Sequence, residues 1–134
     1  MLIVSPLKMQ WEDIYKKVFP DAEWSTTPKE GHDSYLFMWC DKNTRYFINA
    51  GAKKGKYIVF VRRYEYYSEI EKVQWDKVDA VIMVNDWLAD GFKQRTGVTP
   101  HVIYNGVDPS KWTFKERKHG NKIAWVGFIN QKKN

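Results

Sequence analysis

Short apolar runs rich in β-forming residues alternate along this chain with segments of helical periodicity, and this alternation constrains the fold most strongly. The clearest runs are residues 57–61 and 80–84, and helix-like segments lie at residues 9–19 and 86–96. Parallel strands need a long crossover connection, which is usually a helix. Strands that are apolar on both faces indicate a sheet that is covered on both sides. The sequence therefore predicts an α/β fold with a mostly parallel sheet and helices on both faces.

Further elements follow from the same periodicities and from turn residues. We expect additional strands at residues 2–4, 23–25, 34–40, 101–103 and 122–126, and additional helices at residues 42–50 and 68–77. Asp41 is the expected N-cap of the helix at 42–50, Asn85 or Asp86 that of the helix at 86–96, and Gly97 ends the latter. The side chains expected to face the core from the helices are Trp11, Ile14, Tyr15, Val18, Phe19, Tyr46, Phe47, Ala50, Trp87, Leu88 and Phe92.

The composition fits one globular domain with a real core. The chain has 134 residues, of which 43% are hydrophobic, and no apolar run approaches the ~20 residues that span a bilayer. The N-terminus lacks the basic and apolar regions of a secretory signal peptide. The single cysteine, Cys40, excludes an internal disulfide and a zinc cluster, and we interpret it as a small buried hydrophobe. We expect a cytoplasmic protein, with peripheral contact to a membrane surface left open.

The net charge of +6 favours anionic partners, such as nucleotides, phosphates, lipid headgroups or nucleic acid. The basic residues are scattered in small groups, which also suits an ordinary solvated surface. One hypothesis is therefore a non-catalytic α/β module that binds nucleic acid or another polyanion. No RNA- or DNA-binding sequence motif accompanies the charge.

Candidate site residues lie where strands are expected to end, because ligands of open parallel sheets bind beyond the carboxyl ends of the strands. Arg62, Arg63, Tyr64 and Glu65 follow the strand at 57–61, and Asn85 follows the strand at 80–84. A further place lies at residues 105–108, after the strand at 101–103. Two guanidinium groups can grip a phosphate or carboxylate, and Glu65 can pair with one of them or act as a base. The alternative is a surface Arg–Glu pair.

The sequence lacks the common cofactor and catalytic motifs. No G-x-G-x-x-G follows the first strand, and no P-loop, H-E-x-x-H or G-x-S-x-G motif occurs. We therefore predict no metal site and no cofactor. The turn-forming run Asn105, Gly106, Val107 and Asp108 is merely a turn when it is taken alone.

The order of several motifs resembles the group 1 (GT4-like) glycosyltransferases of the GT-B fold. The run at residues 78–85 matches a family strand, and Asn105, Gly106, Val107 and Asp108 match the segment that crosses to the donor-binding domain. Trp112 takes the place of the usual Phe, and the strand at 123–126 leads to Gly127 and Lys133, which match the start of the donor-binding domain. The likeness covers residues 56–134 well and the first 55 by topology alone.

This resemblance implies an acceptor-side, Rossmann-like domain at residues 1–108, an inter-domain linker at 109–121, and the first strand and loop of a donor-binding domain at 122–134. The reaction would move a sugar from a nucleotide-sugar to a hydroxyl acceptor. Arg62, Arg63, Tyr64, Glu65 and Asn85 would then border the acceptor cleft, and Gly127 and Lys133 would approach the donor phosphate. We expect no transfer without the donor-binding domain, whether it is joined to this chain or a separate subunit. The strand at 122–126 could also pair two copies of the chain.

Overall fold

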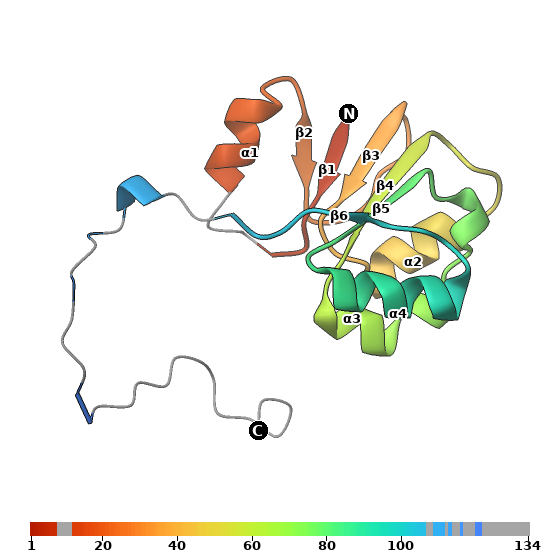
Figure 1. Cartoon of the computed structure of the whole chain (residues 1–134). Helices are drawn as coiled ribbons and strands as arrows, with labels where there is room; N and C mark the ends of the chain where they lie inside the picture. The colour runs from red at the N-terminus through yellow and green to blue at the C-terminus, as the bar shows by residue number, and fades with distance from the viewer. Residues whose placement is uncertain (8–11, 107–108, 112, 114–115, 117–119, 122–134) are drawn as a thin grey trace.

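The computed structural model is an α/β domain built on one six-stranded, all-parallel sheet (Figure 1). It describes residues 1–7, 12–106, 109–111, 113, 116, 120 and 121. The architecture is Rossmann-like, and it confirms the fold class predicted from the sequence.

The strands and helices alternate as the sequence predicted. The strands are β1 (Leu2–Val4), β2 (Glu23–Ser25), β3 (Ser34–Phe37), β4 (Lys56–Val61), β5 (Ala80–Met83) and β6 (His101–Val102). The helices are α1 (Glu12–Val18), α2 (Lys42–Asn49), α3 (Arg63–Ser68) and α4 (Asp86–Thr96), with 3₁₀ turns at Ile70–Lys72, Trp75–Lys77 and Pro109–Lys111.

The strand order is β2-β1-β3-β4-β5-β6, so the chain changes direction across the sheet between β1 and β3. The chain first moves from β1 to the edge strand β2 through α1, and later advances the other way through α2, α3 and α4. Right-handed crossovers in opposite directions place their helices on opposite faces of a sheet. Figure 1 shows this division, with α1 apart from the group formed by α2, α3 and α4. Among the described helices, α1 alone covers its face.

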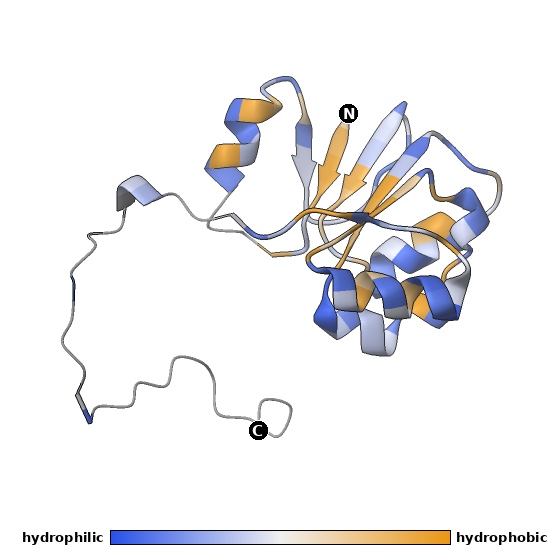
Figure 2. Cartoon of the chain, viewed as in Figure 1, coloured by the Kyte–Doolittle hydropathy of each residue, from blue (hydrophilic) through white to orange (hydrophobic). Residues whose placement is uncertain are grey.

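The larger core lies between the sheet and the group of α2, α3 and α4. Its centre is a cluster of aromatic rings from β3, β4 and α2, in which Tyr35 and Tyr57 meet edge to face with centroids 5.4 Å apart. Phe37 and Phe47 complete the cluster. Figure 2 shows the hydrophobic residues concentrated in the central strands. These buried rings fix the sheet and thereby the ends of its strands.

Both expected helix caps are present. The Asp41 carboxylate accepts a hydrogen bond from the Thr44 backbone N–H (2.8 Å), and the Asn85 side chain accepts one from Leu88 N–H (2.9 Å). Gly97 ends α4 with φ of 75°, a left-handed conformation that suits glycine. Each cap satisfies a backbone group that the end of a helix leaves without a partner.

Several predicted helix details were wrong. A helix begins at Arg63 instead of 68, and most of the segment expected to be helical forms two 3₁₀ turns. Trp87 lies in the first turn of α4 with 67% of its surface exposed, since Leu88, Ala89 and Phe92 form the buried stripe of that helix. Tyr46 is also exposed and lies against the Arg45 guanidinium, with Thr44 and Ile48 buried instead.

The apolar face of α1 is also exposed, contrary to the prediction that it faces the core. Ile14 is 54% exposed and Val18 is 62% exposed. Tyr15 packs against Trp24 of the edge strand β2, with ring centroids 6.3 Å apart. The helix thus sits over the β1–β2 side of the sheet, and part of its apolar face borders open space.

Candidate functional site

The carboxyl ends of the central strands bring the sequence-predicted residues to one edge of the sheet. Arg62 follows the last residue of β4, Asn85 lies two residues beyond β5, and the backbone N–H of Ile103, just after β6, donates to the Met83 carbonyl (2.9 Å). Residues far apart in sequence, from 62 to 105, therefore meet at this edge. The change of direction between β1 and β3 lies at the same edge, where such folds bind ligands.

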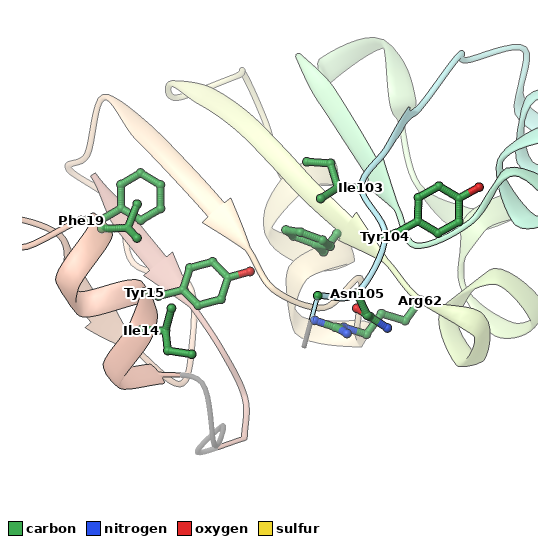
Figure 3. A pocket seen from close by; sticks show the side chains of 10 residues that line it. Ile14, Tyr15, Phe19, Arg62, Ile103, Tyr104 and Asn105 are labelled. Atoms are coloured by element: carbon green, nitrogen blue, oxygen red, sulfur yellow. The ribbon is translucent and has the colours of Figure 1, made fainter. Parts of the chain in front are cut away.

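A cavity of about 660 Å³ opens between α1 and the segment after β6 (Figure 3). Its volume falls within the range of small-molecule sites. The described residues that line it are Ile14, Tyr15, Val18, Phe19, Phe60, Arg62, Ile103, Tyr104, Asn105 and Gly106. Most of these side chains are apolar or aromatic. Arg62 is the one charged side chain among these lining residues.

Arg62 is held at the cavity by aromatic and backbone contacts. Its guanidinium lies over the rings of Trp39 and Phe60, at 5.0 and 5.5 Å from the centroids. Its Nε donates a long hydrogen bond of 3.4 Å to the Met38 carbonyl, which follows β3. Partial burial lowers the pKa of Arg62, although it remains a cation at neutral pH. The half-buried charge makes this end of the cavity attractive to an anion.

The three residues that follow Arg62 differ from it in burial and in contacts. Glu65 is 3% exposed, and its carboxylate accepts a hydrogen bond from the Arg62 backbone N–H (3.1 Å), which closes the first turn of α3. Burial raises the pKa of Glu65, although hydrogen bonds from the backbone N–H groups of Arg62 and of Glu65 itself act to lower it. Arg63 and Tyr64 are exposed on α3. None of these three is among the described lining residues, so Glu65 positions Arg62 through the backbone.

Of the remaining predicted site residues, some line the cavity and others do not. Asn105 and Gly106 line the cavity, whereas Asn85 is engaged as the cap of α4. Val107, Asp108, Gly127 and Lys133 lie outside the described residues. The proposed linker and donor-domain boundaries also stay predictions, since residues 122–134 and much of the linker lie outside the described residues. The structure thus brings Arg62, Asn105 and Gly106 together at one cavity.

The side chains that form the walls of the cavity were not predicted to do so from the sequence. Ile14, Val18 and Phe19 showed a helical period that indicated a core face, but they border the cavity. Tyr104 was not considered, and its hydroxyl donates to the Asp86 carboxylate at the start of α4. That bond ties the segment after β6 to α4. Trp39, whose ring lies under the Arg62 guanidinium, could have been found from its place next to Cys40, where the predicted strand ends.

The single cysteine and the metal-ligating side chains among the described residues do not form a second centre. Cys40 is fully buried, as predicted, and burial raises the pKa of its thiol. In the described part of the chain, no three His, Cys, Asp or Glu side chains gather in a way that could hold a metal ion. Within the same residues, no helix has the length and apolar character to cross a membrane.

Comparisons of this chain with protein-family models, with curated proteins and with solved structures find no match. The geometry of the site and the sequence resemblance therefore carry the functional argument.

Proposed function

We propose that this chain supplies the acceptor-side domain of a GT-B glycosyltransferase, which transfers a sugar from a nucleotide-sugar to a hydroxyl acceptor. One observation carries the proposal: Arg62 and Asn105 line the same cavity. Both residues were predicted to lie beyond the carboxyl end of a strand, and Asn105 also begins the run that resembles the family's domain crossing. A residue that carries the resemblance thus lines the same cavity as the cationic side chain of Arg62.

In this reaction the bond between the anomeric carbon of the sugar and the donor phosphate breaks, and a bond to the acceptor oxygen forms. The acceptor hydroxyl gives up its proton, and the nucleotide diphosphate leaves with the negative charge. This domain would contribute by holding the acceptor in line with the donor, which replaces a costly encounter by a fixed geometry. Arg62 adds positive charge in a partly buried site, where charge acts more strongly than in water.

The donor would be bound by a second domain, for which Gly127 and Lys133 remain the predicted phosphate contacts. That domain is either continuous with this chain or a separate subunit, and we place the reaction in the cytoplasm. Arg63, Tyr64, Glu65 and Asn85 are not among the described lining residues, and their place at the border of the acceptor cleft stays a prediction. Pairing of two copies through the strand predicted at 122–126 stays a prediction as well.

The test is an assay of nucleotide diphosphate release. The chain is tagged at its N-terminus, purified from its source cells with whatever polypeptide continues it or binds it, and supplied with a panel of nucleotide-sugars and a cell extract as acceptor. We expect acceptor-dependent release with one donor, and none from the isolated 134-residue chain. Absence of release with every donor would refute the proposal. Steeply salt-dependent binding of oligonucleotides in the same preparation would instead favour the polyanion-binding module.

A further inference from the structure

We propose that the cavity between α1 and the segment after β6 binds an anionic amphiphile, with its apolar chain along α1 and its charged group at Arg62. The site itself stands on the geometry of the cavity. Only the assignment of this ligand as the sugar acceptor rests on the proposed function.

The apolar wall of the cavity comes from α1. Ile14, Val18 and Phe19 line it, and all three keep a substantial exposed surface. In Figure 3, Ile14 and Phe19 lie on the helix to one side of the cavity, across from Ile103 and Tyr104. Covering such side chains with an apolar ligand removes hydrocarbon surface from water, which is the main driving force for binding in sites of this kind.

The polar end of the cavity comes from Arg62 and Asn105. Both line the cavity, and Figure 3 shows them across the cavity from Ile14 and Phe19. The rings of Trp39 and Phe60 hold the guanidinium in place. Arginine can stack on a ring and bind phosphate or carboxylate at the same time, because its N–H donors lie in the plane of the guanidinium. The Asn105 amide supplies a neutral donor at the same cavity.

The apolar wall and the cationic end of the cavity together indicate which class of ligand it binds. An uncharged hydrocarbon would take water away from a guanidinium without replacing it by an anion, which is costly. A free phosphate would leave the α1 wall in water. No carboxylate is among the described lining residues, so nothing in that set repels an anion. An amphiphile with one anionic group satisfies both ends.

The probe that tests this is decyl phosphate, used below its micelle concentration with the 134-residue chain and titrated by calorimetry. Inorganic phosphate tests the charged group alone, and decanol tests the apolar chain alone. We expect decyl phosphate to bind at least tenfold more tightly than either. Equal binding of decanol and decyl phosphate, or no binding of decyl phosphate, would overturn the proposal.

Three variants locate the binding. Arg62→Met should weaken decyl phosphate binding about tenfold, since a charge-assisted contact is lost, and should not weaken decanol binding, since no guanidinium is then desolvated. Val18→Ser should weaken both, and it should fold normally because Val18 is mostly exposed. Lys93→Met removes one positive charge from the exposed surface of α4 and should change neither. An equal loss in Lys93→Met and Arg62→Met would show general charge attraction and contradict the site.

The outcomes separate this inference from the proposed function. Sugar transfer to a neutral acceptor, without binding of decyl phosphate, would overturn the amphiphile site and leave the glycosyltransferase standing. Binding of decyl phosphate that depends on Arg62, in a protein that transfers no sugar, would support the site and refute the proposed function.

Discussion

The Gly55→Ala variant tests how closely the strands that lead to the cavity are held. A methyl group at this position would lie 2.8 Å from the backbone oxygens of both His32 and Asp33. Ordinary contacts begin at 3.4 Å, so two carbonyl groups have to retreat by about 0.6 Å. They belong to backbone and cannot rotate away as a flexible side chain would. Asp33 also accepts the hydrogen bond of 2.9 Å from Lys56 N–H, with which β4 begins.

The expected cost follows from opposing terms. Overpacking of this kind costs about 1–3 kcal/mol. Loss of unfolded-state freedom on replacing glycine by alanine contributes about 0.4–1 kcal/mol in favour of folding. The net expectation is a destabilisation of about 1–2 kcal/mol, carried by the pairing of β3 with β4.

The assay is urea denaturation, followed by tryptophan fluorescence. Gly120→Ala is the matched control, because the added methyl group meets nothing within 4 Å there, and it should change the free energy of unfolding by less than about 0.5 kcal/mol. A Gly55→Ala chain as stable as the wild type would refute the close approach of these two backbone segments.

Two carboxylates give opposite pH dependence. Burial raises the pKa of Glu65 above its ordinary value of 4.5. Between pH 4.5 and the raised pKa, the folded state keeps a proton that the unfolded state has lost, so the free energy of unfolding falls as the pH rises through this range. Glu65→Gln should therefore have the same free energy of unfolding as the wild type at low pH and a higher one near neutral pH. If the free energies of unfolding from urea denaturation of the two proteins change with pH in parallel, this prediction is contradicted. Partial burial acts to raise the pKa of Asp79, but hydrogen bonds from Lys53 and from the Tyr57 backbone outweigh burial, and the net pKa is lowered. The stabilisation that the Asp79 carboxylate contributes is therefore lost as the pH falls through 3.8 and below. Asp79→Asn should cost about 1 kcal/mol near neutral pH, a gap that narrows in acid; a thermal melt series that shows a constant gap would argue against it.

The fold was largely predictable because its signals are local. Residues 57–61 are β-branched or aromatic throughout, and the caps at Asp41, Asn85 and Gly97 depend on residue types with specific backbone roles. The start of α3 was not predictable in this way. Its first turn depends on the Glu65 carboxylate reaching back to Arg62 N–H, and a strand end followed by polar residues reads equally well as a loop.

The candidate site was predictable only in part. The rule of strand ends found Arg62 and Asn105, and the resemblance added a functional reason for Asn105. The α1 wall was not found, because an apolar helical stripe has the same period whether it faces a core or a cavity. Which of these it faces depends on α1 lying over the β1–β2 side of the sheet. That placement is set by the order of the strands, which no local pattern encodes.

The most direct test of the central claim is the steady-state kinetics of sugar transfer by the chain together with its donor-binding domain, compared between wild type and Arg62→Met. If this domain holds the acceptor, KM for the acceptor rises about tenfold while KM for the nucleotide-sugar stays unchanged. Failure to transfer sugar from any nucleotide-sugar would contradict the account. So would a rise in KM for the donor with KM for the acceptor unaltered.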